Sequence, residues 1–192
     1  MKNKKIYLLL VILLLIILGA IFFALNKKNN TSIGLDTVND LKDMIKVVYK
    51  NANVDLPSIQ TNEIQLGDEG LVSSYTGLKN NDKVEAIVAS EPLMSSQAYS
   101  FVAIKFKKGA DIEKIKEEMY NNINMRKWIC VSAEKLYITN YKNTVVYVMS
   151  NEEWAKPVYE AFKSYVNNNN GKELEKSESL DYELPAEIKP VI

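Results

Sequence analysis

The chain has 192 residues, with 24 basic and 24 acidic side chains, one cysteine and no histidine. The lack of histidine excludes Ser–His and Cys–His catalytic pairs and imidazole metal ligands, and a single cysteine forms neither an internal disulfide nor a four-cysteine zinc site. Residues 1–28 hold five basic groups and no acidic group, so the remainder carries 19 basic against 24 acidic groups, a net charge of −5. Bulk electrostatics therefore disfavours anionic lipid and anionic wall polymers as partners, and we expect no nucleic-acid binding.

The longest apolar run covers residues 6–25 and follows a short basic N-terminus at residues 1–5. At 1.5 Å per residue, a helix of this length spans about 30 Å, the thickness of the hydrocarbon core of a bilayer. A secretory signal has a shorter apolar core, of about 7 to 15 residues, and small residues before its cleavage site. Here Phe22 would occupy the −3 position of a cut after Ala24. We therefore expect an uncleaved single-pass transmembrane helix that anchors the chain in the lipid bilayer.

The lysines around this run predict its orientation. Three lysines and the amino terminus precede it and two lysines follow it, which favours a cytoplasmic N-terminus and an extracytoplasmic C-terminal domain in the cell membrane. Residues 26–35 are polar and short, so they predict a linker that keeps this domain close to the membrane. An inverted topology with a cytoplasmic regulatory domain stays open, because an unpaired cysteine suits a reducing compartment.

The predicted domain, residues 36–166, begins with a helix. Thr37 and Asp40 have the spacing of a capping box, and apolar residues recur at helical spacing over residues 38–52. Proline and glycine punctuate residues 54–70, which we therefore expect to be irregular.

Two hairpins are predicted from runs rich in β-favouring residues around turn-type clusters. The first joins residues 71–77 to residues 84–90, and the second joins residues 135–141 to residues 144–150. A short apolar strand at residues 128–131 precedes the second hairpin.

Between the hairpins, residues 99–106 are apolar on both faces and predict a central strand. Asp111 then caps a helix whose charged side chains, Lys116 among them, are expected to face water. Ser150 and Glu153 form another capping box for a last helix, in which Pro157 predicts a kink or a late start.

The order helix, hairpin, strand, helix, hairpin, helix predicts an α+β domain, in which an antiparallel sheet packs with about three helices. Residues 167–192 are rich in Glu, Lys, Ser and Pro and predict a disordered acidic tail. Scattered apolar residues in this tail leave open that it docks on the domain or on a partner.

The most unusual stretch is Arg126–Val131. Cys130 could be a reactive thiol whose pKa is lowered by Lys127 or Arg126. A cysteine in an apolar strand is more often a small buried side chain, and Trp128 a core aromatic. Because no histidine is available as a base, we favour the structural interpretation.

The second candidate is the polar loop at residues 91–98, which feeds the predicted central strand. A serine nucleophile would need a base, and the chain has no Ser-x-x-Lys motif, so contact with a protein or peptide is favoured over hydrolysis. The candidate binding residues are Pro92, Met94, Ser95, Ser96, Gln97, Arg126, Trp128 and Cys130. We predict no catalytic residue, no cofactor and no metal, since no glycine-rich phosphate loop or EF-hand spacing occurs.

Two sets of motifs carry a resemblance to a known group. They are Pro92-Leu93-Met94 followed by Tyr99-Ser100, and the nine residues 126–134 followed by Val148-Met149-Ser150. In these motifs, residues 36–166 resemble small membrane- or lipid-anchored extracytoplasmic proteins of unknown function from clostridia and related Gram-positive bacteria. The resemblance implies a Gram-positive, extracytoplasmic setting and no catalytic residue. Members often bear a lipobox cysteine, which this chain lacks, so here the helix would be the anchor.

The sequence thus predicts a non-enzymatic binding or assembly module of the cell envelope, with another envelope protein or peptide as its partner. The alternative is a cell-envelope enzyme that uses Cys130 or the loop at residues 91–100.

Overall fold

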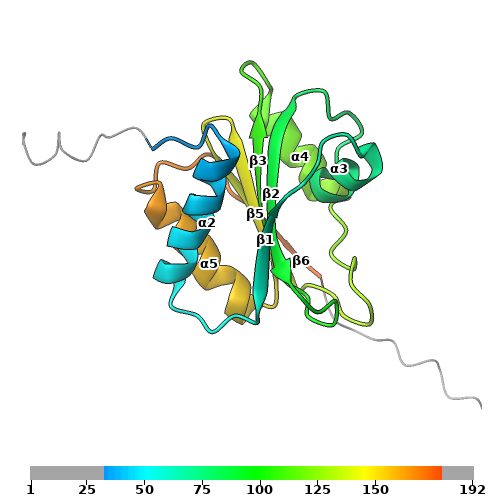
Figure 1. Ribbon diagram of the computed structural model, residues 1–192, viewed down its shortest axis with the longest axis vertical. Coiled ribbons are helices and arrows are strands. Elements are labelled where there is room, and N and C mark those ends of the chain that lie inside the picture. Colours follow the sequence, from blue (N-terminus) through cyan, green and yellow to red (C-terminus); the bar gives the residue numbers. More distant parts are fainter. Residues whose placement is uncertain (1–32, 179–192) are drawn as a thin grey trace, which may run out of the picture. The chain divides into compact units, whose positions relative to one another are not determined.

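The computed structural model describes residues 33–178 (Figure 1). The predicted membrane anchor at residues 6–25, most of the linker and residues 179–192 of the expected tail lie outside this range. Within the described residues, none of the helices combines the length and the apolar character needed to cross a membrane. The fold described below belongs to the unit that begins at Leu35.

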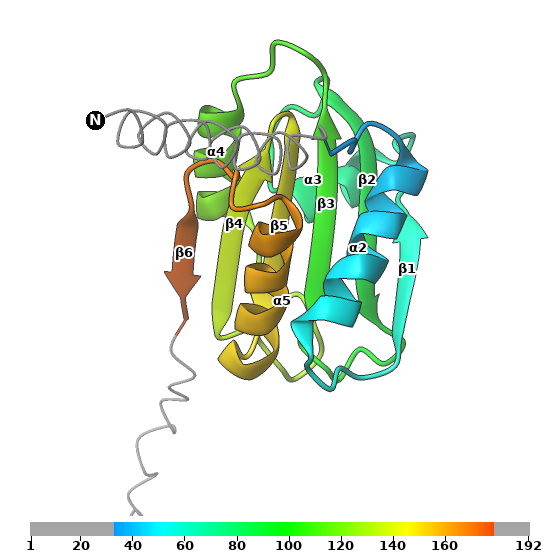
Figure 2. The same cartoon turned by 90° about the vertical axis from the view of Figure 1, so that its left-hand side faces the viewer.

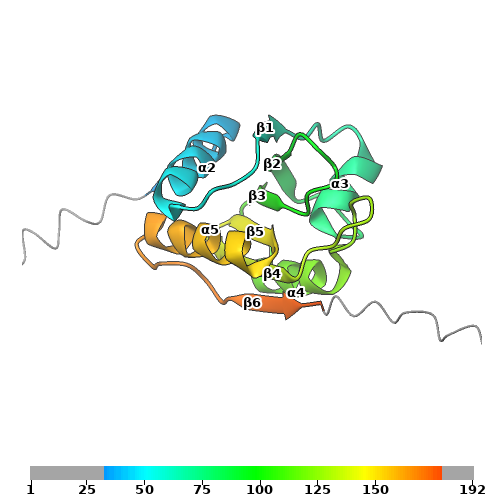
Figure 3. The ribbon, with the colours of Figure 1, turned by 90° about the horizontal axis from the view of Figure 1, so that it is seen from below.

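Six antiparallel strands form one sheet in the order β1-β2-β3-β5-β4-β6, which Figure 3 shows end-on. The strands are β1 (Ile59–Glu63), β2 (Val84–Pro92), β3 (Ser100–Phe106), β4 (Lys135–Tyr141), β5 (Thr144–Ser150) and β6 (Leu174–Ser177). The helices are α2 (Val38–Ala52), α3 (Glu69–Thr76), α4 (Ile112–Asn122) and α5 (Glu152–Tyr165). The predicted α+β class with an antiparallel sheet is confirmed, and within residues 33–178 four helices rather than about three accompany the sheet.

The sheet separates two helical layers. Helices α2 and α5 cover one face, and α3 and α4 cover the other (Figures 1 and 2). Strands β3 and β5 are therefore buried on both sides, as the apolar character of residues 99–106 predicted. Val102, Ile104 and Tyr147 belong to a core cluster that also contains Val72 of α3 and Met119 of α4.

Local signals placed most elements correctly. In α2, the Thr37 hydroxyl accepts a hydrogen bond from the Asp40 amide (3.1 Å), and the Asp40 carboxylate accepts one from the Thr37 amide (2.9 Å), which is the predicted capping box. Helix α5 differs in its cap, because Asn151 rather than Ser150 accepts from the Trp154 amide (2.9 Å). The helix begins at Glu152 and includes Pro157, so the late start is wrong.

The first predicted hairpin is wrong. Residues 69–76 form helix α3, in which the Asp68 carboxylate caps the Leu71 amide (2.9 Å) and Gly77 ends the helix with a φ of 66°. The strand that pairs with β2 in place of residues 71–77 is β1, which lies within the segment expected to be irregular. Ser90, two residues before the end of β2, supports this pairing, because its hydroxyl forms hydrogen bonds with both Thr61 on β1 (2.8 Å) and Tyr49 on α2 (2.7 Å).

Two further predictions are overturned. No strand forms at residues 128–131, which belong to the connection between α4 and β4. There Cys130 has a φ of 61°, a left-handed conformation that interrupts an extended chain. The expected disorder from residue 167 is wrong as far as residue 178, because residues 174–177 form β6 on the edge of β4.

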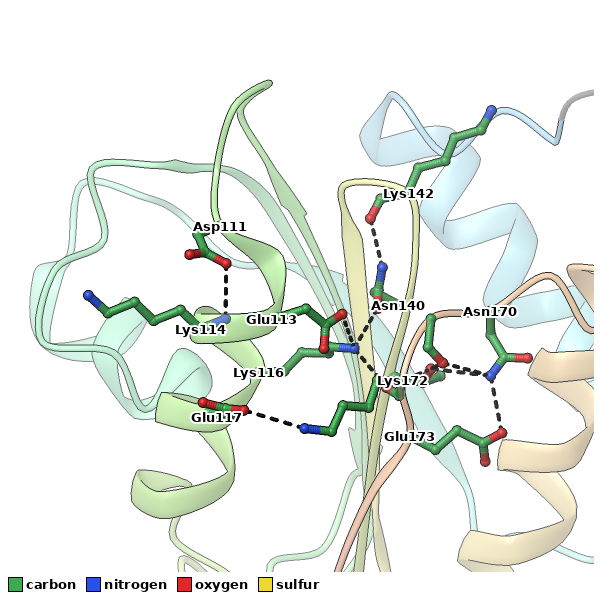
Figure 4. Close-up of polar contacts among 12 residues, drawn as sticks. Asp111, Glu113, Lys114, Lys116, Glu117, Asn140, Lys142, Asn170, Lys172 and Glu173 are labelled. Carbon is green, nitrogen blue, oxygen red and sulfur yellow. Dashed lines mark hydrogen bonds and ion pairs between the residues drawn. The ribbon is translucent and has the colours of Figure 1, made fainter.

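Lys116 explains why the C-terminal segment is ordered. The sequence predicted that its side chain faces water, but the side chain is fully buried. Its ammonium donates hydrogen bonds to Asn140 Oδ1 (2.7 Å) and the Lys172 carbonyl (2.7 Å), and it forms an ion pair with Glu113 (2.8 Å) (Figure 4). Three acceptors offset the cost of burying the charge. Gly171 completes this junction, since its amide donates to the Asn140 carbonyl (2.8 Å).

Replacing Gly171 with alanine tests this junction. The new Cβ would lie 2.1 Å from Asn140 Oδ1, an atom already held by Lys116, so the Lys116 hydrogen bond must break or β6 must shift. We expect Gly171→Ala to lower the free energy of unfolding by about 1–3 kcal/mol, measured by urea unfolding of the detergent-solubilised chain. Gly67→Ala is the matched control, because no atom lies within 4 Å of its Cβ. Equal stability of the two variants would contradict the proposed role of the junction.

Candidate functional site

The two stretches that the sequence singled out meet at one end of the sheet. Strand β2 ends there at Pro92, β3 begins at Ser100 and β4 begins at Lys135. The connections at residues 93–99 and 123–134 therefore lie at the same end. An ion pair joins them, in which Lys127 Nζ contacts Glu91 Oε1.

Four side chains form what we call the Glu91–Lys127 cluster: Tyr75, Glu91, Ser100 and Lys127. Besides the contact with Lys127, Glu91 Oε1 accepts a hydrogen bond from the Ser100 hydroxyl (2.7 Å) and Glu91 Oε2 accepts one from the Tyr75 hydroxyl (2.8 Å). Lys127 Nζ also lies 3.2 Å from Ser100 Oγ. The cluster thus links α3, β2, β3 and the α4–β4 connection at one carboxylate.

Aromatic rings cover the ammonium of Lys127. Its Nζ lies 4.7 Å from the centroid of the Tyr75 ring and 5.2 Å from the Trp128 ring, both within the range of cation–π attraction. Trp128 is half-buried and packs against the core below the sheet end. It therefore contacts Lys127, and its packing against the core agrees with the structural interpretation of Trp128.

The electrostatics of the cluster follow from partial burial. Burial alone would raise the pKa of Glu91, but the Lys127 ammonium and the three hydrogen bonds outweigh it and hold this pKa below its ordinary value. Burial lowers the pKa of Lys127 by more than the attraction of Glu91 raises it. Burial and then the Glu91 charge raise the pKa of Tyr75, so this hydroxyl remains a neutral donor.

Tyr147 on β5 adds a buried hydroxyl beside the cluster. Burial raises its pKa well above the ordinary value, and the charge of Glu91 adds to the effect. Among the described residues, no group meets the full geometry of a hydrogen bond with this hydroxyl, although the Ser100 side chain is close enough to act against the rise of its pKa. Ser100 is also fully buried, and Lys127 donates to Glu91. The Glu91–Lys127 ion pair therefore presents neither a nucleophile nor a free base at the surface. This ion pair holds the two connections together, and we call it the clamp.

The clamp is flanked by exposed apolar side chains on both connections. Leu93 and Met94 are each 65% exposed, and Ile129 is 69% exposed. Ser95 and Ser96, which follow Met94, are also exposed, whereas Pro92 and Gln97 are half-buried. The Glu91–Lys127 contact thus brings the two predicted stretches together, and each stretch carries exposed apolar side chains, which we call the loop surface (Leu93, Met94 and Ile129).

Arg126 and Cys130 differ from their predicted places. Arg126 is exposed and pairs with Glu178 (2.7 Å), so it stabilises the end of the C-terminal segment. Cys130 is exposed rather than buried in a strand. Among the described residues, no group of three or more Cys, Asp or Glu side chains has the geometry to hold a metal.

Glu91, Ser100 and Tyr75 were missed as site residues. Tyr75 lay in a segment predicted as a strand, and Glu91 was assigned to a loop. The signal available in the sequence is a carboxylate at the end of one strand and a serine at the start of the next, both adjoining apolar runs. Buried polar groups of this kind require partners.

Comparisons of the chain with protein-family models, curated proteins and solved structures find no match. The resemblance to anchored clostridial proteins therefore stays a prediction.

Replacing Glu91 with glutamine tests the clamp. The Lys127 ammonium would keep its partial burial without a compensating charge, so we expect Glu91→Gln to lower the free energy of unfolding by about 1–3 kcal/mol. Glu91→Gln combined with Lys127→Met should cost less than the sum of the two single changes, as a double-mutant cycle in urea would measure.

Acid should destabilise the fold for the same reason, because it removes the charge of Glu91 from the ion pair with Lys127. Because the pKa of Glu91 in the folded chain is below the ordinary 4.5, its ionisation stabilises the fold above that value, and this stabilisation is lost as the pH falls through the folded pKa. Glu91→Gln should therefore lose less stability than the wild type between neutral pH and the region below 4.5. Parallel pH profiles of the two proteins would contradict the clamp.

Cys130 should react as an exposed thiol. We expect stoichiometric alkylation of the folded chain without denaturant, measured by mass spectrometry, with a change of less than about 0.5 kcal/mol in the free energy of unfolding. Protection until denaturant is added would show that Cys130 is buried, as the sequence predicted.

Proposed function

We propose that this chain is a single-pass membrane protein that displays its α+β domain outside the cytoplasmic membrane as a non-enzymatic binding module of the cell envelope. The apolar run at residues 6–25 and its flanking lysines support the anchor and its orientation. The loop surface is the observation that carries the binding role.

Exposing large apolar side chains to water is unfavourable in free energy, and patches of such side chains on a protein surface mark interaction sites. Leu93 and Met94 follow β2 directly, where the Leu93 amide donates to the Ser58 carbonyl (3.1 Å). Ile129 follows Lys127 and Trp128, which the clamp holds. A rigid sheet end thus presents apolar groups that no described element covers.

The position of the loop surface favours a protein partner. Leu35, where the domain begins, lies at the other end of the sheet, because its carbonyl accepts from Thr144 at the start of β5 (3.1 Å). The loop surface lies near Ser150, where β5 ends. Seven residues of strand, about 20 Å, separate the two ends. A domain tethered through Leu35 therefore presents the loop surface away from its tether, to the apolar surface of another envelope protein or peptide.

Replacing the three side chains with serine tests this role. The variant Leu93→Ser, Met94→Ser, Ile129→Ser should keep its stability within about 1 kcal/mol, because the residues are exposed. It should lose the proteins that cross-link to the wild type in membranes. Val47→Ser, Leu71→Ser is the control, since both residues are apolar and about 40% exposed on helices. Unchanged cross-linking of the triple variant would contradict the proposed surface.

Cys130 supplies a test of topology on the unmodified chain. A membrane-impermeant thiol reagent should label it in intact cells. Labelling only after permeabilisation would place the domain in the cytoplasm, as in the inverted topology.

A further inference from the structure

A hollow of about 330 Å³ is lined by residues of α5, β4 and the edge segment that contains β6. Helix α5 packs on β4 and β5, and β6 pairs with β4 at the edge of the sheet (Figure 2). Two stacked rings line the hollow, those of Tyr137 on β4 and Tyr159 on α5, whose centroids are 5.0 Å apart. The other lining residues are Glu152, Lys156, Glu160, Glu173, Leu174 and Glu175.

The hydroxyl of Tyr137 has no hydrogen-bond partner among the described residues. Tyr137 is only 6% exposed, yet its hydroxyl is not enclosed, because in the described part of the chain the enclosed polar side-chain atom without a hydrogen bond is the Tyr147 hydroxyl. The Tyr137 hydroxyl therefore opens into the hollow that its side chain lines. The Tyr159 hydroxyl, by contrast, donates to Glu173 (3.0 Å). A buried ring thus presents an unpaired donor and acceptor to the hollow.

One ammonium group serves two carboxylates at the side of the hollow near Lys163. Its Nζ lies 2.9 Å from Glu160 Oε1 and 3.2 Å from Glu173 Oε2. Tyr159 and Asn170 donate further hydrogen bonds to Glu173. Glu160 is exposed, and Lys163 is its partner among the described residues through one oxygen. This side of the hollow therefore carries a net negative charge and keeps a carboxylate oxygen that can accept a hydrogen bond.

The side of the hollow near the start of β4 has three carboxylates and two ammonium groups. Lys135 lies 2.7 Å from Glu175, and Lys156 lies 3.5 Å from Glu152. Glu134 is the third carboxylate, with Oε2 3.4 Å from the Glu152 amide. The two sides together thus hold five carboxylates and three ammonium groups, an excess of two negative charges.

The other lysines of the C-terminal segment do not restore the balance. Lys172 pairs with Glu117 (3.4 Å) and Lys176 donates to the Tyr120 carbonyl (3.4 Å). Both contacts are with α4, which covers the opposite face of the sheet. The hollow on the α5 side therefore keeps its negative charge, and a cation is the ligand that this charge favours.

We propose that this hollow binds a small aliphatic amine through a primary ammonium group. An ammonium group donates three hydrogen bonds, which the Tyr137 hydroxyl and the carboxylates of Glu160 and Glu175 can accept. The strand register sets Glu175 opposite Tyr137, so these two acceptors lie side by side. The described carboxylates do not converge as the ligands of a metal ion would. The volume of the hollow also suits a small organic molecule, for which sites begin at about 300 Å³.

Calorimetric titration of the full-length chain in non-ionic detergent tests this inference, with cadaverine as the probe. Its two primary amines are charged at neutral pH, as the amine of lysine is. We expect one binding site, with an affinity that falls at high salt. Pentanediol, which has the same length and no charge, should not bind. The derivative in which both amines are trimethylated keeps the charge but donates no hydrogen bond, so it should bind about tenfold more weakly.

Tyr137→Phe locates the ammonium group. This substitution removes a hydroxyl that has no partner in the fold, so we expect unchanged stability in urea and about tenfold weaker binding of cadaverine. Tyr141→Phe is the matched control, because Tyr141 lies on the same strand, is also 6% exposed and does not line the hollow. Glu160→Gln should weaken binding about threefold, whereas Glu63→Gln, which removes the same charge from an exposed position on β1, should not change it.

The inference is independent of the membrane anchor and of the loop surface, and its test leaves both untouched. Absence of cadaverine binding, or equal affinity of the Tyr137→Phe variant and the wild type, would overturn it. Equal affinity for the trimethylated derivative, or for calcium chloride, would show that the hollow attracts any cation and would overturn recognition of a primary ammonium group. Should Tyr137→Phe fail to fold, equal affinities of the exposed-site variants Glu160→Gln and Glu63→Gln would have the same meaning.

Discussion

The attraction between Lys127 and Glu91 is the constraint on which the end of the sheet that carries the candidate site depends. The two residues are 36 positions apart, and their contact fixes the long α4–β4 connection against the end of β2. That connection has no regular structure, so ordering it costs conformational entropy that its own backbone hydrogen bonds do not offset. Hydrogen bonds from Tyr75 and Ser100 give the carboxylate two further donors, and such added hydrogen bonds are the condition under which a partly buried ion pair stabilises a fold.

The sequence predicts elements whose signals are local and fails where tertiary contacts decide. The capping box of α2, the apolar strand β3 and the β4–β5 hairpin each follow from neighbouring residues. Residues 71–76 carry apolar side chains compatible with either a strand or a helix, and the Asp68 cap and Gly77 decide for α3. Strand β1, with the sequence IQTNE, has no strand periodicity. Its conformation follows from the free edge of β2 and from the Ser90 hydroxyl, neither of which a local pattern contains.

The candidate site, too, contains some features that local sequence predicts and others that depend on tertiary contacts. Met94 and its neighbouring serines were predicted as an exposed polar loop from composition alone. The partnership of Glu91 with Lys127 depends on sheet order, which brings the ends of β2, β3 and β4 together. Lys116 was predicted to face water, because helical periodicity places it among charged neighbours on the solvent side of α4, but its side chain is buried. The C-terminal segment covers that side and supplies the Lys172 carbonyl as an acceptor.

Antiparallel topology also determines which residues meet at each end of the sheet. Each turn between paired strands collects residues from distant parts of the sequence at one end of the sheet, and turns favour polar residues. The tight β4–β5 turn and the segments beside it contribute lysines at the end where the chain enters. The longer connections at the other end carry Leu93, Met94 and Ile129. One end of the sheet thus carries lysines and carboxylates together, and the other end, about one strand length away, carries exposed apolar side chains. The exposed apolar side chains therefore lie at the end of the sheet opposite to Leu35, where the domain begins.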